Sequence, residues 1–380
     1  MKILKAFKFE LMPDGEQIRK MKQFCGCSRF VFNRALAYQN EQYQQNNSFK
    51  FSYAKIANLL PEWKRELGWL KDCHSQVLQQ SLKDLEAGFK NFFAKRAYFP
   101  KFKRKGDKDS FRFPQGCKLE QPNNRICLPK IGWVRYRNSR NVSGCLKNVT
   151  VSQKCGKWYV SIQTELEAEI PIPKGGEIGI DMGITRFATL SNGKFFNPIN
   201  VFATLKGKLA KLQKQFKNKT KFSKNWQKLK AKISKLHHKI SNIRKNYLHQ
   251  ITSEISQNHA IVFVEDLQVA NMSKSAKGNA EQHGKNVKQK SGLNRAVLDQ
   301  SWYEFRRQLD YKLLWNGGHL IAVPPQNTGR CCPACRHTSK DNRQTQSLFE
   351  CVECGYKNNA DIVGAINVLR RGQAILAAQK

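Results

Sequence analysis

The chain has 380 residues, 40% of them hydrophobic, which is enough for two or three domains with buried cores and excludes a disordered chain. Lys and Arg number 67 against 28 Asp and Glu, a formal net charge of +39, and this excess predicts a polyanionic partner, meaning nucleic acid. A basic surface for anionic membranes is the weaker alternative, because no lipidation signal accompanies the charge and no apolar run approaches the ~20 residues of a membrane span.

The N-terminal residues 1–8 alternate charged and apolar side chains and lack the apolar core of a signal peptide. We therefore expect a cytosolic protein with reduced thiols, so that its 12 cysteines do not form a disulfide framework. The same alternation over residues 2–11 predicts a strand. Asp14 and Gln17 then predict a capping box at the start of a helix.

Residues 13–97 predict a mostly helical block, with helices over 53–60 and 75–97, because apolar side chains recur there at spacings of three and four. From Phe99 the pattern changes to short alternating runs separated by Pro and Gly, which predicts a small β-barrel over 98–173. We expect the first strand to join this barrel, so that the helical block is an insertion between two barrel pieces.

A glycine pair at 175–176 predicts a linker, and residues 178–190 and 194–196 then predict a β-hairpin that turns at 191–193. Residues 201–250 carry 15 Lys or Arg and no acid, and their apolar residues repeat by four and three, which predicts a helix or hairpin pair with one apolar seam. The seam consists of Leu229, Ile233, Leu236, Ile240, Ile243 and Tyr247. Because 15 uncompensated cations repel one another, we favour a nucleic-acid contact over a solvated charged face.

The following segments lead towards the cysteines. Residues 261–265 predict a short buried strand, and the polar segment 271–293 is predicted to be mobile. Apolar residues between Trp302 and Leu313 predict a helix that stops at the glycines 317–318, and residues 319–323 predict a strand.

Four cysteines have the spacing of a zinc ribbon. Cys332 and Cys335 form one Cys-x-x-Cys pair, Cys351 and Cys354 form another, and 15 residues separate the pairs. Four thiolate ligands leave the ion no open position, so we expect one structural Zn²⁺ that holds a segment too small for its own core. Cys331 is adjacent to the first pair and could compete for the ion.

Three carboxylates lie at the ends of apolar elements. Asp181 closes the run from Glu177, Glu265 closes the buried strand, and Asp361 opens an apolar helix. A carboxylate there is unfavourable unless positive charge compensates it, and two magnesium ions in such a site cleave phosphodiesters. We therefore expect the three acids to converge as ligands for two Mg²⁺ ions in an RNase H-like fold. Asp266 is the weaker candidate, because it points to the opposite face of its strand.

A competing interpretation uses the same first acid. Residues 180–185 are close to the phosphate loop of actin-like ATPases and sugar kinases, which share this sheet topology. Those proteins need a second glycine-rich phosphate loop and an adenosine pocket, and the sequence predicts neither. The zinc ribbon and the charge also argue against this interpretation.

Over nearly its whole length the chain resembles the TnpB family of transposon-encoded RNA-guided nucleases, which is related to the type V CRISPR effectors. The set of matching motifs is specific, although no single piece is. They are Lys5-Ala-Phe-Lys-Phe9 with Pro13, Cys27-Ser-Arg-Phe-Val-Phe-Asn33, Pro100-Lys-Phe-Lys103, Leu128-Pro-Lys-Ile-Gly-Trp133, Gly156-Lys-Trp-Tyr-Val160, Gly179-Ile-Asp-Met-Gly183, Val264-Glu-Asp-Leu267, the cysteine pairs, and Asn359-Ala-Asp-Ile-Val-Gly-Ala-Ile-Asn367. The doubled Cys331-Cys332 and the short tail after Gly372 depart from the family pattern.

The resemblance implies an α+β multidomain fold: a small β-barrel (wedge) with an inserted helical recognition domain, and an RNase H-like (RuvC) α/β domain that carries a zinc ribbon. The expected boundaries are 1–12 for the first wedge strand, 13–97 for the recognition domain, 98–173 for the rest of the wedge, 174–328 for the RuvC-like nuclease domain, 329–356 for the zinc ribbon, 357–372 for the final RuvC helix and 373–380 for a tail.

The resemblance also implies an RNA-guided DNA endonuclease with Asp181, Glu265 and Asp361 as RuvC-type catalytic acids and magnesium ligands. The implied partners are a guide RNA from the transposon end and double-stranded target DNA beside a short flanking motif. A monomer in the prokaryotic cytosol, close to the nucleoid, is the expected state. A nuclease-inactive RNA-guided DNA-binding protein, a transposase acting directly in strand transfer, and a zinc-ribbon RNA-binding protein remain as alternatives.

Two further expectations concern nucleic-acid contacts. The aromatic residues Tyr98, Phe99 and Phe102, interleaved with Lys and Arg, are candidates for stacking on bases, whereas core packing is the better interpretation of Trp133. Segment 271–293 is a candidate lid over the cleavage site.

Overall fold

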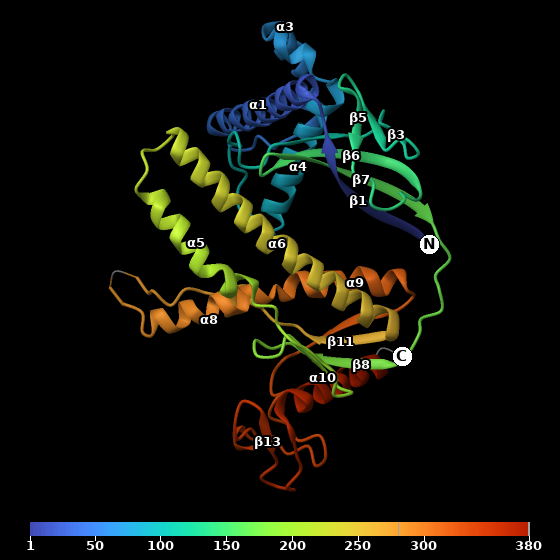
Figure 1. Ribbon diagram of the computed structural model, residues 1–380, viewed down its shortest axis with the longest axis vertical. Coiled ribbons are helices and arrows are strands. Elements are labelled where there is room, and N and C mark those ends of the chain that lie inside the picture. Colours follow the sequence, from blue (N-terminus) through green and yellow to red (C-terminus); the bar gives the residue numbers. More distant parts are fainter. Residues whose placement is uncertain (280, 379–380) are drawn as a thin grey trace. The chain divides into compact units, whose positions relative to one another are not determined.

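The computed structural model describes residues 1–279 and 281–378 (Figure 1). The chain divides into two units, Met1–Ala168 and Glu169–Lys380. Two sequence expectations extend outside the described residues: the tail over 373–380 includes positions 379 and 380, and the segment 271–293 includes position 280.

The first unit contains a seven-stranded antiparallel sheet in the order β2-β6-β7-β1-β5-β4-β3. Its strands are β1 Lys2–Met12, β2 Ser110–Phe113, β3 Lys118–Glu120, β4 Arg125–Leu128, β5 Gly132–Tyr136, β6 Cys145–Lys154 and β7 Lys157–Glu167. The first strand lies between β7 and β5, which confirms that the N-terminal strand joins the later ones across the helical block. No pairing between β2 and β3 closes the sheet within residues 1–168, so the closed barrel stays a prediction.

Helices α1 Gly15–Gln45 and α4 Ser75–Phe93 share one apolar core with this sheet. Alternate side chains of β1 are buried, as its pattern of charged and apolar residues predicts. Phe24 of α1 packs edge-on against Phe111 of β2, with ring centroids 5.4 Å apart. The capping box is present: Asp14 accepts from the Gln17 backbone, and the Gln17 side chain accepts from the Asp14 backbone.

The predicted helices of this unit need two corrections. The helix expected over 53–60 is two short helices, α2 Tyr53–Ala57 and α3 Leu60–Glu66, because Pro61 sits in the first turn of α3, where a missing N–H is tolerated. Helix α4 ends at Phe93, four residues before the expected end at 97. A short 3₁₀ turn, η1 Gly68–Asp72, connects α3 to α4.

The second unit is built on a five-stranded sheet in the order β10-β9-β8-β11-β12. Strands β8 Glu177–Asp181, β11 Ile261–Glu265 and β12 His319–Val323 are parallel, and β9 Ala188–Leu190 and β10 Phe195–Phe196 add antiparallel neighbours. The strand expected over 178–190 is therefore two strands, because the chain reverses after Asp181 through a turn closed by Gly183 N–H and Phe187 C=O. The second turn, at 191–193, is as predicted.

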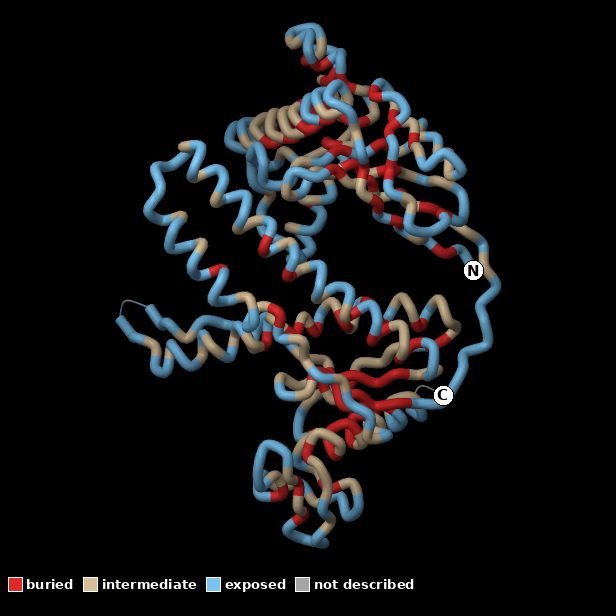
Figure 2. The backbone as a smooth tube through the Cα atoms, in the orientation of Figure 1, coloured by how far each residue is buried: buried red, intermediate tan, exposed pale blue. Residues whose placement is uncertain are grey.

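Helices cover both faces of this sheet (Figures 1 and 2). They are α5 Val201–Lys217, α6 Lys224–Asn258, α7 Val269–Met272, α8 Val287–Gln300, α9 Trp302–Trp315 and α10 Ala360–Ala377. Val262 and Val264 of β11 share a buried cluster with α6 and α9, whereas Phe263 packs with Val368 of α10. Since side chains alternate along a strand, α10 lies on the face opposite α6 and α9.

Two further expectations concern helices of this unit. Residues 201–250 form the predicted helical hairpin, α5 and α6, although Ile243 of the expected seam is exposed. The segment 271–293 is not irregular throughout, because α8 begins at Val287 despite its polar composition. Helix α9 ends as predicted, before Gly317 with φ +78°.

Among the described residues no helix combines the length and apolarity that crossing a bilayer requires.

The cysteine segment lies between β12 and α10. It contains the short 3₁₀ turn η2 Lys340–Asn342 and the antiparallel pair β13 Leu348–Glu350 and β14 Lys357–Asn359. Its small cluster of buried residues, Cys332, Phe349, Cys351, Ala360 and Val363, reaches into the start of α10.

Candidate functional site

Asp181 and Glu265 end neighbouring parallel strands at the same edge of the second sheet. The register pairs Ile180 of β8 with Val264 of β11, so each acid is the next residue along its strand. Parallel strands present their carboxyl ends at one edge, which brings these two side chains to the same place. The register therefore places Asp181 and Glu265 at one edge of the sheet.

Asp361 reaches this edge through the first turn of α10. The Asn359 side chain caps the helix by accepting from the Asp361 backbone N–H at 3.1 Å, so the Asp361 carboxylate is not needed as the cap. One turn later the helix contacts Asp181: a Cβ on Gly364 would lie 3.2 Å from its Cγ and Oδ2. Residues three apart share a helix face, so Asp361 and Gly364 approach Asp181 together.

The electrostatics of Asp181 depend on both other acids. Burial, and then the charges of Glu265 and Asp361, raise the pKa of the Asp181 carboxyl to about 8, while Arg343 opposes this shift. Glu265 is 6% exposed, and its burial also raises its pKa, although the Thr328 hydroxyl and Arg371 oppose the rise. Like charges held in a buried site favour the protonated form unless a cation compensates them.

This donor set fits magnesium. Buried carboxylates with excess negative charge are hard oxygen ligands, which Mg²⁺ prefers. The four ribbon thiols all lie within 4.8 Å of one another. Within the described part of the chain, the three carboxylates are not all this close together. Two ions in a shared site lie about 3.5–4 Å apart, so such a site does not require every ligand pair to touch. The roles of Asp181, Glu265 and Asp361 as metal ligands stay predictions.

Three residues near the acids, Thr328, Arg343 and Asn367, were not predicted from the sequence as part of the site. The Thr328 hydroxyl donates to Glu265 Oε1 at 2.6 Å, and Arg343 Nη2 lies 3.6 Å from Asp361 Oδ1. The buried Asn367 amide donates to the backbone carbonyls of Thr328 and Cys331, both at 2.7 Å, and so fixes the loop that carries Thr328. Only Asn367 had a signal in the sequence, as the last residue of the motif that begins at Asn359.

Asp266, the weaker candidate, does not join the acids. Its carboxylate pairs with Arg306 of α9.

A cleft of about 300 Å³ opens beside Glu265 on this side. It is lined by Met182, Glu265, Asp266, Leu267, Gln268, Val269, Ala270, Trp302, Tyr303 and Arg306.

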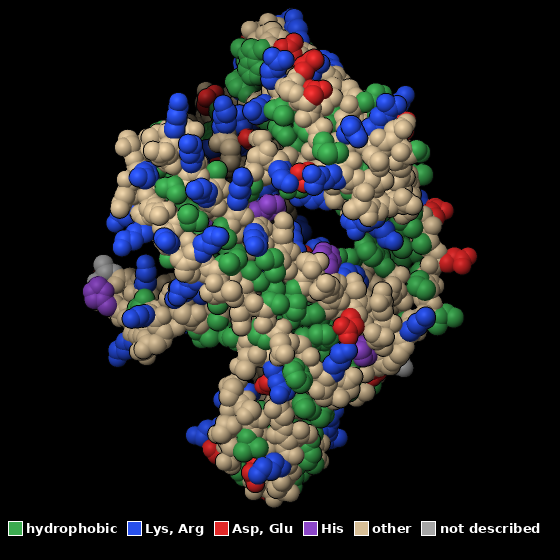
Figure 3. Space-filling view, in the orientation of Figure 1, with side chains coloured by type: hydrophobic (Ala, Val, Ile, Leu, Met, Phe, Trp, Pro, Cys, Tyr) green, Lys and Arg blue, Asp and Glu red, His purple; other side chains and the backbone are tan. Residues whose placement is uncertain are grey.

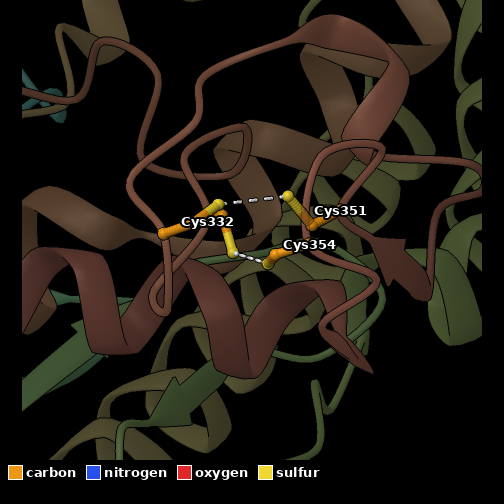
Figure 4. Close-up of side chains that lie close together, drawn as sticks. Cys332, Cys351 and Cys354 are labelled. Atoms are coloured by element: carbon orange, nitrogen blue, oxygen red, sulfur yellow. Dashed lines mark hydrogen bonds between the residues drawn. The ribbon is translucent and has the colours of Figure 1, made fainter.

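The four predicted zinc ligands gather in one place. The thiols of Cys332, Cys335, Cys351 and Cys354 all lie within 4.8 Å of one another. Sulfur atoms of Cys332 and Cys354 are 3.6 Å apart, and those of Cys335 and Cys351 are 3.5 Å apart (Figure 4). The Cys331 thiol is directed instead to the Arg336 carbonyl at 3.6 Å, so it does not compete for the site.

The local backbone favours a thiolate at Cys351. Burial alone would raise the pKa of this thiol, but the backbone N–H groups of Cys354 and Glu353 and the neighbouring thiols outweigh burial and lower it to about 6. A thiolate is the form that binds a metal. The sulfur geometry and this chemistry fit one tetrahedral Zn²⁺ with no open position.

A cationic surface covers α5 and α6. Figure 3 shows Lys and Arg side chains gathered over these helices. None of the lysines between Lys206 and Lys239 forms an ion pair with a carboxylate within residues 1–279 and 281–378. Their charge is therefore uncompensated by the protein, as expected for a surface that binds nucleic acid.

The aromatic residues proposed for stacking are exposed. Tyr98, Phe99 and Phe102 all present large parts of their side chains to solvent. The interpretation of Trp133 as a core residue is wrong: it is 41% exposed on β5, with the Arg125 guanidinium 4.8 Å from the centre of its ring. The reason is the alternation of β5, which buries Val134 and Tyr136 and turns Trp133 outward.

Comparison with known proteins gives a consistent family. Residues 161–276 match the family described as "Probable transposase", residues 302–368 match the "Cas12f1-like, TNB domain", and residues 1–48 match a "Helix-turn-helix domain". The chain is 57% identical over 380 residues to a protein of Escherichia coli K12 named "Putative RNA-guided DNA endonuclease InsQ", covering 99% of this chain and 94% of that one.

A second relative, from Streptomyces pristinaespiralis, is named "Putative RNA-guided DNA endonuclease" and is 30% identical over 385 residues, covering 99% of this chain and 91% of its own. Among solved structures, a Cas12f1–sgRNA–target DNA complex matches with a TM-score of 0.58 over 97% of this chain and 98% of that one. Its sequence identity is 12%, so this last likeness concerns the fold alone.

Proposed function

The chain belongs to the TnpB family of transposon-encoded RNA-guided nucleases, and from that premise we propose that it cleaves target DNA by magnesium-dependent hydrolysis at Asp181, Glu265 and Asp361. The observation that carries the proposal is the placement of the acids: Asp181 and Glu265 end neighbouring parallel strands, and the helix that carries Asp361 packs against the Asp181 carboxylate. A buried carboxyl beside two further acids favours its protonated form, and a bound divalent cation would instead stabilise its charged form.

The residues around the acids have distinct roles in this proposal. Glu265 is held by the Thr328 hydroxyl, and Thr328 is held by Asn367, so the orientation of the carboxylate is fixed before substrate arrives. With no cation bound, the Asp181 carboxyl retains its proton near neutral pH. Binding of Mg²⁺ beside it would favour loss of this proton. Arg343 lies beside Asp361 and limits the excess of negative charge.

Two Mg²⁺ ions bound by Asp181, Glu265 and Asp361 would supply an activated water and stabilise the leaving 3′ oxygen. The ribbon thiols would hold one Zn²⁺ that stabilises the segment between β12 and α10.

Specificity in this proposal comes from a guide RNA transcribed from the transposon end. Base pairing would read the target sequence, and the protein would read backbone shape and a short flanking duplex motif. The lysines of α5 and α6 would contact phosphates, which makes binding strongly dependent on salt. Sequencing the RNA that copurifies with the expressed protein tests this part: recovery of random cellular RNA would contradict it.

Two alternatives make different predictions. A nuclease-inactive DNA-binding protein of the same lineage would lack one or more of the acids, and here all three are present. A transposase acting directly would join DNA ends, which the description of the matching family as "Probable transposase" keeps open. Assaying for joined products together with cut products separates hydrolysis from strand transfer.

The decisive experiment replaces Asp181 by Asn. This change keeps the side-chain shape and removes its charge, so cleavage of a guided target should fall by at least about 10²–10³-fold while RNA and DNA binding stay near their original affinity. Asp266→Asn is the matched control and should retain cleavage, because Asp266 pairs with Arg306 away from the acids. Lost binding with cleavage merely slowed would contradict the role given to Asp181.

A further inference from the structure

The turn between α5 and α6 carries an unusual aromatic residue. Phe222 is 68% exposed, although most phenylalanines of the described chain are wholly or partly covered. Its backbone has φ +68°, a left-handed conformation that glycine and asparagine adopt readily and other residues adopt at a cost. The chain therefore presents a large apolar ring to water at a position where a small polar residue would fit the backbone better.

Local hydrogen bonds hold this conformation in place. The Gln227 side chain donates to the Phe222 carbonyl at 2.9 Å, and the Ser223 hydroxyl caps α6 by accepting from the Trp226 backbone N–H at 3.1 Å. Because both bonds start from the first turn of α6, the helix fixes the turn. The ring of Phe222 is thus displayed by an anchored backbone.

Packing inside the α5–α6 hairpin does not explain why a phenylalanine occupies position 222. Phe216 of α5 and Trp226 of α6 already pack on each other at the end of the hairpin, with ring centroids 5.0 Å apart. The Phe222 ring lies beside this pair, with its centroid 5.5 Å from that of the Trp226 ring. Most of its apolar surface gains nothing from the fold, since it stays in water.

The charged residues of the turn around Phe222 are lysines. Lys221 Nζ lies 5.2 Å from the centre of the Phe222 ring, and Lys230 Nζ lies 5.2 Å from that of Trp226. Lys219 and Lys224 flank the same turn, and no Asp or Glu occurs between residues 201 and 253. An apolar pocket of a protein partner would have to desolvate these cations, whereas phosphates on either side of a base would pair with them.

We infer that the tip of the α5–α6 hairpin is a binding site for an unpaired nucleobase, which stacks on Phe222 while the adjacent lysines contact the flanking phosphates. Exposed aromatic rings among cations are the usual platform for single-stranded nucleic acid, because every base offers a π-face. This site is separate from the acid cluster, so it concerns the binding of a strand and not its cleavage.

The test uses the full-length protein, freed of copurifying nucleic acid in high salt and kept without magnesium. Fluorescence anisotropy measures its affinity for a labelled single-stranded DNA, a single-stranded RNA of the same length and sequence, and a blunt DNA duplex. Phe222→Asn should weaken binding of single strands about tenfold, within the range of one lost stacking contact, and change duplex binding less than twofold. The DNA and RNA arms decide which kind of strand the site prefers.

Asparagine suits the left-handed backbone, so Phe222→Asn should leave the melting temperature unchanged or slightly higher. Phe222→Trp keeps a stacking ring and should restore affinity. Phe195→Asn is the matched control: Phe195 is also an exposed phenylalanine beneath a cation, Arg186, but lies on the edge strand β10. Its loss should not weaken binding of single strands.

Salt dependence separates stacking from charge. Phe222→Asn should leave the slope of log K against log salt unchanged, whereas Lys221→Ala should reduce its magnitude by about 0.7. Unchanged single-strand affinity in Phe222→Asn, an equal loss for the duplex, or failure of Phe222→Trp to restore binding would each overturn the inference. None of these results bears on guided cleavage, so the site and the proposed nuclease activity stand or fall separately.

Discussion

The cysteine cluster and the acid cluster of the second unit are two groups of candidate metal ligands that the fold assembles in different ways. The four thiols come from two short local motifs and lie within 4.8 Å of one another without an ion. The three carboxylates come from two strands and a helix far apart in the chain, Asp181 at the end of β8, Glu265 at the end of β11 and Asp361 in the first turn of α10. Each thiol pair is placed by its own Cys-x-x-Cys segment, whereas the carboxylates come together only through the register of β8 and β11 and the packing of α10.

Among variants of the two clusters, Cys351→Ser is expected to have the largest effect, which is the loss of zinc. Removing one of four thiolate ligands should lower bound zinc from one ion per chain to near zero and expose the segment 329–356 to proteases, since a ribbon of this size depends on its ion for folding. Zinc content and limited proteolysis measure this. Cys331→Ser is the control, because the Cys331 thiol faces away from the site; a full zinc content in Cys351→Ser would refute the ligand assignment.

Gly364→Ala should act on the acid cluster alone. The added Cβ would lie 3.2 Å from the Asp181 carboxylate and displace it, so guided cleavage should fall about 10–100-fold while zinc content and nucleic-acid affinity stay unchanged. Gly207→Ala, in helix α5 with open space around it, is the matched control. If both variants cleave normally, the Asp181 carboxylate does not need its observed position.

Thr328→Val tests how the acid cluster depends on its surroundings. The change removes the 2.6 Å hydrogen bond to Glu265 and should raise the magnesium concentration needed for half-maximal cleavage about tenfold, because the hydroxyl orients the carboxylate and favours its charged form. Titration of cleavage against magnesium measures the shift. Thr204→Val in α5 should leave the curve in place, and a shift in both variants would point to a general loss of stability.

The smallest expected effect is a pH dependence of stability that distinguishes the two clusters. Without magnesium the pKa of Asp181 is about 8 in the folded protein against an ordinary value of 3.8, so the folded state holds this proton more tightly. The corresponding stability is fully present below pH 3.8 and is lost as pH rises through about 8.

Melting temperature in magnesium-free buffer should accordingly fall by a few degrees, roughly, between pH 5 and 8.5. Added magnesium should reverse the fall, because the cation replaces the proton. Asp181→Asn, which cannot titrate, should flatten the dependence. A slope that is the same in this variant would assign the effect to other groups.

The sequence predicted which four cysteines gather, whereas it missed part of the surroundings of the acids. Spacing alone locates Cys332, Cys335, Cys351 and Cys354, because each pair forms its own local turn. The acids were predicted from the ends of apolar runs, but Thr328 and Arg343 lie in loops with no pattern, and only the tertiary fold brings them to Glu265 and Asp361.

The errors in the fold have similar causes. A helix over 53–60 was predicted because apolar periodicity continues past Ala57, while the local effect of Pro61 starts a new helix. Helix α8 was missed because its polar composition resembles that of a loop. In both places short-range interactions decide the structure against the average pattern of the segment.

The pairing of Ile180 with Val264 determines where the chain can change in length. One residue added within β11 would rotate every later side chain of the strand to the other face, so Glu265 would point away from Asp181. The residues described between Ser273 and Asn286, those at 274–279 and 281–285, contribute no strand to this sheet, so an added residue among them leaves the register intact. Insertions and deletions among natural variants are therefore expected to accumulate in this connection, while the segment 261–265 keeps a constant length.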